Sequence, residues 1–371
     1  MPEPGRIGAL SCEGNLVSVS IALDMTFANR NRGGSGVYAR SLLSALRERE
    51  DAAAWVIAGP TQSNPVGTVR WLVSGARKAV NAKPPDLVHC PSFVAPWRIS
   101  VPFVVTVHDA GARVAAADHP LEWRAYDRMF MPARLRAAAA VITGSEFARR
   151  EVVEAYRLKP DRVFAVPYGL DSRYFKFQAN LQPVNDRGAI LFPGAPVGRK
   201  NVDAVLRCMA ASANGALGRV TLDISGAREQ DFPAVMARIR SLGLEGRVRW
   251  LGQVPQDQMP DVIASASAVV YPSFYEGFGF PPLEAMAVGT PVVASDRGSL
   301  PEVLDGAALL IDPTDDRALS QALESVLTQP ELRKRLSRSG RERARTFTWQ
   351  TCADRTLELY RSVLEEHGSA A

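Results

Sequence analysis

Two glutamates separated by seven residues, Glu276 and Glu284, stand out in the segment YEGFGFPPLEAMA. An ionised carboxylate accepts hydrogen bonds from neighbouring hydroxyl groups, so each glutamate could hold a sugar diol. Gly277 and Gly279 permit a close approach of the backbone, and the following pair of prolines suits the first turn of a helix, whose free amides attract phosphate. The segment therefore predicts a binding site for two sugars joined by a diphosphate.

Each of these glutamates, taken alone, has a simpler explanation. Glu276 could be solvated in a loop, and Glu284 could complement the positive end of a helix. The glycines, prolines and acids all fall within one short segment, and such agreement of independent local rules favours the functional interpretation.

A second glycine loop, FPGAPVGRKN, places Arg199 and Lys200 beside another predicted helix start. Arginine binds phosphate oxygens in a bidentate manner and lysine supplies a compact charge, so the pair predicts a contact with the diphosphate. An ordinary basic pair on the surface is the alternative. No D-x-D sequence occurs in the chain, whereas transferases that hold a diphosphate through a metal usually offer paired carboxylates. We therefore expect no metal and no cofactor.

The glycine-rich stretch RGGSGVYA follows the first predicted strand and opens a helix. The residues from Gly34 to Ala39 match the dinucleotide pattern G-x-G-x-x-A, but two features disfavour an NAD site. The loop from Met25 to Gly33 is too long for that tight turn, and the second strand ends at Gly59-Pro60 where an acidic residue for the ribose is expected.

His108 ends the strand-like run Pro102–His108. A parallel strand delivers such a residue to the carboxyl edge of its sheet, where α/β proteins bind their ligands. A buried histidine that is satisfied by Asp109 or by a backbone carbonyl is the alternative.

Apolar runs alternate with amphipathic stretches along the chain, a pattern typical of parallel strands with crossover helices. Two such series flank the polar, unpatterned stretch Asp171–Gly188, so we predict an α/β protein with two doubly wound domains facing a cleft. Helical patterns include Val37–Arg49, Phe147–Tyr156 and Trp349–Glu366. The predicted strands are Val17–Met25, Ala53–Gly59, Asp86–Cys90, Pro102–His108, Ala139–Thr143 and Val163–Val166, then Ala189–Phe192, Arg219–Ser225, Val248–Leu251, Ala268–Tyr271, Pro291–Ala294 and Ala307–Ile311.

The composition is that of a soluble globular protein, because 46% of the 371 residues are hydrophobic and 22% are charged. The net charge of +5 fits an anionic substrate, a membrane surface or a solvated exterior, and no basic block with interleaved aromatics indicates nucleic-acid binding. Four scattered cysteines predict neither a metal site nor a disulfide framework. The start MPEP lacks a signal-peptide pattern and no apolar run reaches about 20 residues, so we expect a cytoplasmic protein.

The stretch Leu121–Arg136 mixes aromatic residues and methionines with several arginines. Such a helix could lie in a membrane interface and meet a lipid-linked acceptor at the inner face of the plasma membrane. A helix with one buried face and an arginine-rich outer face has the same pattern.

Together these segments resemble the large family of retaining glycosyltransferases numbered four, which has the two-Rossmann-domain architecture called GT-B. The E-x7-E signature from Glu276 to Glu284 carries the resemblance, and VGTPVVAS, GRKN, VPYGLD and GSE also match. The resemblance implies an N-terminal acceptor domain of residues 1–178, a donor domain of residues 179–348 and a terminal helix of residues 349–371 that crosses back. It also implies a hexosyltransferase of polysaccharide or glycoconjugate synthesis, with a nucleotide-diphosphate sugar as donor and a saccharide or lipid-linked saccharide as acceptor.

The resemblance assigns catalytic roles to His108 and Glu276 at the donor sugar, and to Arg199 and Lys200 at the diphosphate. Glu284 would hold the ribose, and same-face attack by the acceptor would retain the configuration of the sugar. The aromatic-rich segment around Glu276 resembles bacterial mannosyl- and glucosyltransferases, which favours GDP-mannose. The other predicted donor-binding residues are Gly33, Gly34, Ser35, Gly36, Gly277, Phe278, Gly279, Phe280, Gly298, Ser299 and Leu300.

Three other activities fit a double-Rossmann protein. A nucleotide-sugar epimerase shares the architecture, but the E-x7-E segment argues against it. A non-catalytic nucleotide-sugar-binding protein would have been expected to lose Glu276, Arg199, Lys200 and His108. An NAD-dependent oxidoreductase lacks the acidic residue expected for its ribose.

Overall fold

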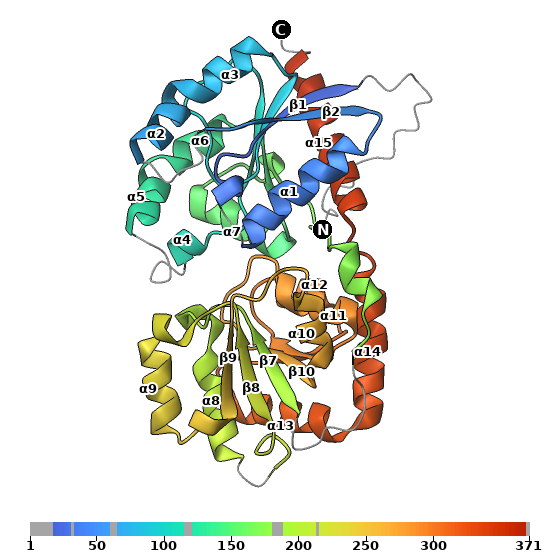
Figure 1. The fold of residues 1–371 in the computed structure, drawn as a ribbon. Helices are drawn as coiled ribbons and strands as arrows, with labels where there is room; N and C mark the ends of the chain where they lie inside the picture. The colour runs from blue at the N-terminus through green and yellow to red at the C-terminus, as the bar shows by residue number, and fades with distance from the viewer. Residues whose placement is uncertain are drawn as a thin grey trace.

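The chain folds into two α/β domains, one above the other in Figure 1, with the terminal helix running beside the upper one. The computed structural model describes residues 18–30, 33–59, 65–114, 121–179, 188–212 and 215–368. Val17, Cys12 and residues 180–187 of the predicted linker lie outside these ranges.

The N-terminal domain is built on a parallel six-stranded sheet in the order β2-β1-β3-β4-β5-β6. Its central strands are continuous apolar runs because helices cover both faces of a parallel sheet. The strand order reverses between β1 and β3, which is the order of flavodoxin-like sheets. The strands are β1 (Val19–Asp24), β2 (Ala52–Ile57), β3 (Leu87–Cys90), β4 (Phe103–Thr106), β5 (Ala140–Thr143) and β6 (Val163–Ala165).

The C-terminal domain carries a second parallel six-stranded sheet in the order β12-β11-β10-β7-β8-β9. This is the Rossmann order, and it reverses between β7 and β10, where open α/β sheets bind ligands. The strands are β7 (Ala189–Pro193), β8 (Thr221–Ser225), β9 (Val248–Gly252), β10 (Ala268–Tyr271), β11 (Val292–Ser295) and β12 (Leu309–Ile311). The predicted strand runs are confirmed to within a few residues at each end, and so is the predicted fold class.

Helices cover both sheets, and their apolar faces complete the buried cores. In the N-terminal domain they are α1 (Gly34–Arg47), α2 (Pro65–Arg70), α3 (Ala76–Ala82), α4 (Gly111–Val114), α5 (Leu121–Met129), α6 (Met131–Ala137) and α7 (Glu146–Tyr156). In the C-terminal domain they are α8 (Val202–Ala211), α9 (Pro233–Ser241), α10 (Met259–Ser265), α11 (Phe280–Val288), α12 (Leu300–Leu304), α13 (Asp316–Thr328) and α14 (Pro330–Ala344).

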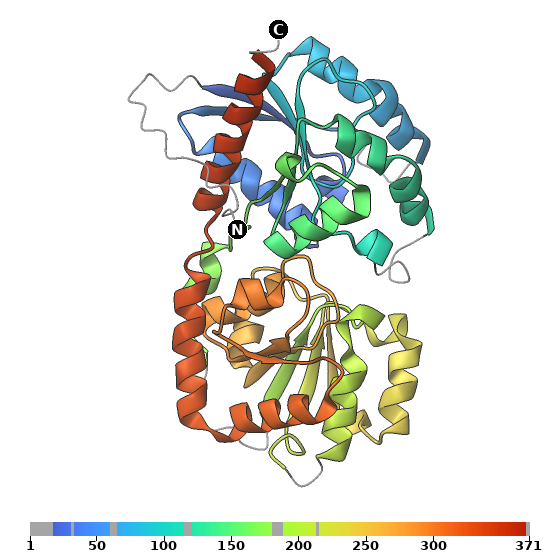
Figure 2. The same cartoon turned by 180° about the vertical axis from the view of Figure 1, so that it is seen from behind.

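The terminal helix α15 (Trp349–Gly368) leaves the C-terminal domain and packs on α1 of the N-terminal domain, as both views show (Figures 1 and 2). The hydroxyl of Tyr360 lies 2.6 Å from Nδ1 of the buried His89, and Arg361 pairs with Asp51 at 2.6 Å. These contacts tie the end of the chain to β3 and to the start of β2.

One helix was predicted too long. The stretch Leu121–Arg136 forms two helices, α5 and α6, which are separated at Phe130. Pro132 stands in the first turn of α6, and proline in a helix interior removes a hydrogen bond and clashes with the preceding turn. A single interfacial helix across this stretch is therefore wrong.

Candidate active site

The two loops at the reversal point of the C-terminal sheet meet through Arg199 and Glu276. Nη1 of Arg199 lies 2.6 Å from Oε1 of Glu276, and the hydroxyl of Tyr271 donates to the same oxygen at 2.9 Å. Both of these contacts reach Oε1 of the carboxylate. Oε2 can therefore accept from a ligand hydroxyl without disturbing the ion pair.

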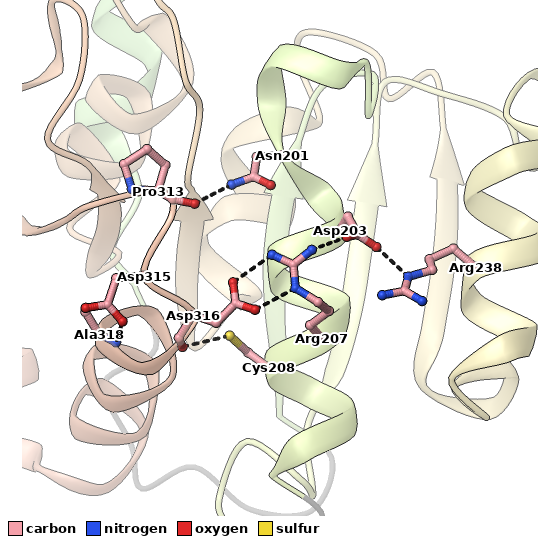
Figure 3. A network of polar contacts seen from close by, with 9 residues as sticks. All are labelled: Asn201, Asp203, Arg207, Cys208, Arg238, Pro313, Asp315, Asp316 and Ala318. Atoms are coloured by element: carbon pink, nitrogen blue, oxygen red, sulfur yellow. Dashed lines mark hydrogen bonds and ion pairs between the residues drawn. The ribbon is translucent and has the colours of Figure 1, made fainter.

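The loop that carries Arg199 is fixed by the next residues of the chain. Asn201 adopts a left-handed conformation (φ 57°), which asparagine tolerates, and its side-chain amide donates to the carbonyl of Pro313 at 2.8 Å. Figure 3 shows this contact beside an ion-pair network in which Arg207 binds Asp203 and Asp316 and so joins α8 to α13. The start of α8 is therefore anchored on both sides.

Lys200 lies on the inner side of the same loop. Its ammonium lies 3.4 Å from the carbonyl of Pro193 and 5.2 Å from the centre of the Tyr271 ring. Burial lowers the pKa of Lys200, and the nearby Glu276 opposes this shift. Gly194 (φ 94°) leaves the space that the ammonium occupies, since a side chain there would overlap it. A phosphate beside Lys200 would favour its charged form.

The start of α11 offers fewer amides than the sequence pattern implies. Gly279 precedes the helix with φ 97°, and Pro281 and Pro282 in its first turn have no N–H group. The amides of Gly279 and Phe280 are the donors that remain at this end. A diphosphate at this point would therefore depend on Arg199 and Lys200 as well.

Glu284 lies one turn further along α11 and is half-buried. It accepts a hydrogen bond from Tyr174, which lies in the short helix η5 (Ser172–Lys176) of the predicted linker. Burial raises the pKa of Glu284 to about 7, and the bond from Tyr174 opposes this shift. The carboxyl group therefore changes its charge near neutral pH.

His108 follows β4 in the N-terminal domain. Its Nδ1 lies 2.8 Å from the hydroxyl of Tyr168, and its Nε2 is buried with no hydrogen-bond partner among the described residues. Burial lowers the pKa of His108 to about 4, and the Pro91 carbonyl opposes this shift, so the imidazole is neutral at pH 7. A neutral Nε2 without a partner can form a hydrogen bond with a ligand that reaches it.

Aromatic rings connect His108 to the loop that follows Glu276 and to the start of α11. Tyr168 lies 4.8 Å from Phe278 and stacks on Phe280 at 5.7 Å, measured between ring centres. A Cβ atom added to Gly34 would lie 3.3 Å from the Phe280 ring, so the first residue of α1 also lies close to these aromatic rings. The structure thus brings the predicted segments of both domains together.

The segment from Gly298 to Leu300 supports Glu276 from behind. The amide and the hydroxyl of Ser299 both donate to the Glu276 carbonyl, at 3.0 and 2.9 Å. Gly298 (φ 67°) lies so close that a Cβ atom there would be 2.8 Å from the same carbonyl oxygen. Ser299 therefore holds the Glu276 backbone here, and a phosphate contact of this segment stays a prediction.

Four tyrosines around the site were not predicted: Tyr168, Tyr174, Tyr271 and Tyr275. Each places its hydroxyl on a predicted site residue or on the loop that carries one. Two of them lie inside the motifs VPYGLD and YEGFG, but the presence of a tyrosine in a sequence does not separate a positioning role from packing. Among the described residues, no group of three or more His, Cys, Asp or Glu side chains could hold a metal ion.

Comparison with known proteins assigns both halves of the chain. Residues 175–343 match the model of the glycosyl transferases group 1, and residues 32–174 match the model of glycosyltransferase family 4. The chain is 32% identical over 282 residues to the O-antigen chain mannosyltransferase B of Escherichia coli, with 74% of each protein covered. It is also 32% identical over 284 residues to the MMP alpha-(1->4)-mannosyltransferase of Mycolicibacterium hassiacum, with 72% of this chain and 67% of that protein covered.

Solved structures show the same fold at lower identity. Sucrose-phosphate synthase from Thermosynechococcus elongatus aligns with a TM-score of 0.76 at 23% identity, over 93% of this chain and 99% of that one. Anabaena HepE in complex with UDP and glucose aligns with a TM-score of 0.73 at 18% identity, over 93% and 100%. With the family models and the mannosyltransferase relatives on the same residues, the chain belongs to glycosyltransferase family 4 and is a hexosyltransferase of GT-B architecture.

Proposed function

We propose that this enzyme transfers mannose from GDP-mannose to a glycan or lipid-linked saccharide, with retention of configuration and without a metal ion. The observation that carries the proposal is the Arg199–Glu276 pair at the reversal point of the donor sheet. Glu276 of this pair lies on the loop whose next residue, Gly277, contacts the backbone of His108 in the other domain. A positive group for the diphosphate and an acceptor for sugar hydroxyls are thus adjacent.

The chemistry follows from the charge that develops in the reaction. As the glycosidic bond breaks, negative charge grows on the diphosphate oxygen, and Arg199 and Lys200 stabilise that charge because they are already in place. Glu276 accepts a hydroxyl of the donor sugar through Oε2 while Oε1 stays on Arg199. The Nε2 of the neutral His108 binds the sugar from the acceptor side. The two domains exclude water from the reacting carbon.

Retention is proposed as same-face attack. A double displacement needs a carboxylate that bonds to the reacting carbon, whereas this proposal assigns Oε2 of Glu276 to a hydroxyl of the donor sugar and leaves Oε1 on Arg199 and Tyr271. Metal independence rests on the basic pair and on the absence of D-x-D from the sequence.

The choice of mannose rests on the two relatives, which are both named mannosyltransferases. The HepE structures hold UDP, with glucose or as UDP-glucose, so UDP-glucose is the alternative donor. The E. coli relative is named for the O-antigen chain, which favours a role in surface polysaccharide synthesis.

A peripheral membrane contact is the second part of the proposal. Val114, Leu121 and Met129 are 58%, 74% and 68% exposed, and they lie on or beside α5 with the exposed Arg124 and Arg128. Figure 1 places α4 and α5 at one edge of the N-terminal domain, which the resemblance assigns to the acceptor. None of the helices in the described ranges has the length and apolarity needed to cross a bilayer. Sedimentation with anionic vesicles tests this contact. We expect the parent protein to sediment with the vesicles and the double variant Leu121→Ser/Met129→Ser to stay in the supernatant.

The test of the transferase proposal is a screen of the purified protein against GDP-, UDP-, ADP- and dTDP-sugars with EDTA present. We expect thermal stabilisation and slow sugar release with GDP-mannose, and an about 100-fold or larger loss of sugar release in Arg199→Ala. Arg249→Ala is the matched control, because Arg249 pairs with Asp223 at 2.7 Å on the outside of the same domain. Equal turnover in Arg199→Ala and Arg249→Ala would contradict the site, and a strict need for a divalent cation would contradict metal independence.

A further inference from the structure

The residues on both sides of Glu276 dock on the N-terminal domain, although Glu276 itself belongs to the C-terminal domain. Tyr275 is 7% exposed, and its hydroxyl accepts a hydrogen bond from the amide of Ala110 at 3.0 Å. The same hydroxyl donates to Oε2 of Glu151 at 2.5 Å. Both of its hydrogen-bonding partners therefore come from the opposite domain.

Gly277, on the other side, is in equally close contact. Its carbonyl accepts from the buried hydroxyl of Ser145 at 2.8 Å. A Cβ atom added to Gly277 would lie 2.6 Å from the carbonyl oxygen of His108 and 2.6 Å from Cβ of Asp109. The backbone that carries Glu276 thus lies against the backbone that carries His108.

Helix α7 provides two of these contacts, through its N-cap residue Ser145 and through Glu151, and it lies on the side of its domain that faces α12 (Figure 1). Ser145 caps the helix through the amide of Ala148, and Glu302 of α12 accepts from the amides of Glu146 and Phe147 at 2.8 and 3.0 Å. A carboxylate at a helix N-terminus is stabilised by the free amides and the helix dipole. The C-terminal domain therefore holds α7 at its first turn through Glu302 and at Glu151 through Tyr275.

Within its own domain the Glu276 segment is fixed differently. Ser299 holds the backbone carbonyl, and Arg199 and Tyr271 hold the side chain. These contacts do not require the N-terminal domain. The contacts of Tyr275 and Gly277 do require it, so they form only when the two domains meet.

We propose that Tyr275 is a positioning residue whose hydroxyl couples the meeting of the domains to the orientation of Glu276. The coupling is direct because Tyr275 and Glu276 are neighbours on one loop, and Nη1 of Arg199 donates both to the Tyr275 carbonyl at 3.0 Å and to the Glu276 carboxylate at 2.6 Å. This inference rests on the proposed function in one respect, namely that Glu276 contacts the donor sugar. Glu151 and the Ala110 amide are the fixed points that orient Tyr275.

The test compares Tyr275→Phe with Tyr156→Phe. Both variants keep the ring and lose a hydroxyl that donates to a carboxylate at 2.5 Å, but Tyr156 reaches Asp127 inside the N-terminal domain. We expect Tyr275→Phe to lower kcat for transfer about 10-fold with KM for the donor nearly unchanged. Tyr156→Phe should keep the kcat of the parent enzyme. Glu151→Gln should retain most of the rate, since its amide oxygen still accepts, and Glu151→Ala should not.

A second readout does not depend on turnover. With saturating nucleoside diphosphate, amide hydrogen exchange in residues 273–280 should be faster in Tyr275→Phe than in the parent protein, while exchange in β10 stays the same. Equal kcat in Tyr275→Phe and Tyr156→Phe, or unchanged exchange in the loop, would overturn the proposal. Faster exchange in a protein that transfers no sugar would preserve the coupling and reject the proposed function instead.

Discussion

The hydroxyl of Tyr168 lies 2.8 Å from Nδ1 of His108, and the ring of the same tyrosine stacks on Phe280 of the opposite domain. One side chain therefore holds the candidate histidine by its polar end and the first residue of α11 by its face. A neutral imidazole needs such a partner at one nitrogen to fix the orientation of the other. The orientation of His108 Nε2 is thus linked to the start of α11, the helix predicted to bind the donor.

Replacement of Tyr168 by phenylalanine should slow transfer without unfolding the enzyme. The ring and its stacking on Phe280 are kept, and one hydrogen bond of about 1 kcal/mol is lost, so we expect kcat to fall about 3- to 10-fold. Tyr38→Phe is the control, because the Tyr38 ring lies 5.2 Å from His108 while its hydroxyl points to Thr106 at 3.0 Å. Steady-state kinetics measure both variants, and a kcat that is lower in Tyr38→Phe than in Tyr168→Phe would contradict this role.

Most of the fold could be predicted from the sequence, because buried parallel strands are short apolar runs and the crossover helices are amphipathic. The runs Ala268–Tyr271 and Ala140–Thr143, for example, are strands with every residue buried. The order of the strands was not predictable, since periodicity does not say which strands are neighbours. The division between α5 and α6 depends on Pro132, which also suits a helix start, and the pattern did not separate the two cases.

The candidate site could be predicted where local sequence determines geometry. Glycine loops before helices located Arg199 and Glu276, and the structure brings the two side chains to 2.6 Å. The tyrosine contacts could not be predicted, because Tyr168 meets His108 across 60 positions and Tyr275 meets Glu151 across 124. Contacts of this kind depend on tertiary packing, within one domain for Tyr168 and between the domains for Tyr275, which no short pattern encodes.

Donor binding should depend on pH through Glu284. Its pKa is raised to about 7 by burial, and the ionised form is the one predicted to accept hydrogen bonds from both ribose hydroxyls, so affinity for the nucleotide sugar should rise between about pH 6 and pH 8. For one group with a pKa near 7, the change is about 10-fold at most. Isothermal titration calorimetry with GDP-mannose at several pH values measures it, and Glu284→Gln should remove the dependence.

The same carboxyl group should affect stability. Glu284 is protonated more readily in the folded protein than in the unfolded chain, so its ionisation lowers the free energy of unfolding as the pH rises from about 4.5 to about 7. Above pH 7, Glu284→Gln should therefore be more stable than the parent protein, by about 3 kcal/mol at most. Urea denaturation at pH 5 and pH 8 tests this. If Glu284→Gln is less stable than the parent protein at pH 8, burial of the ionised Glu284 does not destabilise the fold.

The left-handed Asn201 should matter for the stability of the protein. Asn201→Ala loses the hydrogen bond to Pro313 and strains the backbone, so we expect a loss of about 2 kcal/mol in the free energy of unfolding. Asn201→Gly loses the bond but keeps the conformation, so its loss should be about 1 kcal/mol smaller. Arg207→Met breaks an ion-pair network whose side chains are 37% to 43% exposed, and it should cost under about 1 kcal/mol. Urea denaturation compares the three, and an Asn201→Gly variant less stable than Asn201→Ala would contradict this order.

Gly277→Ala should separate nucleotide binding from transfer. An added methyl group would lie 2.6 Å from the His108 carbonyl, well inside van der Waals contact, so the two domains could not approach to the distance seen here. Arg199 and Glu284, which are predicted to bind the nucleotide sugar, belong to the C-terminal domain and should keep their positions. We therefore expect transfer to fall by about 100-fold or more, while the dissociation constant for the nucleoside diphosphate changes by about threefold or less.

The matched control is Gly246→Ala, since Gly246 is exposed with no atom within 4 Å of an added Cβ, and it should resemble the parent enzyme. Small-angle scattering with nucleotide sugar would then show a larger radius of gyration for Gly277→Ala alone, and full transfer activity in that variant would mean that the domains do not need this contact.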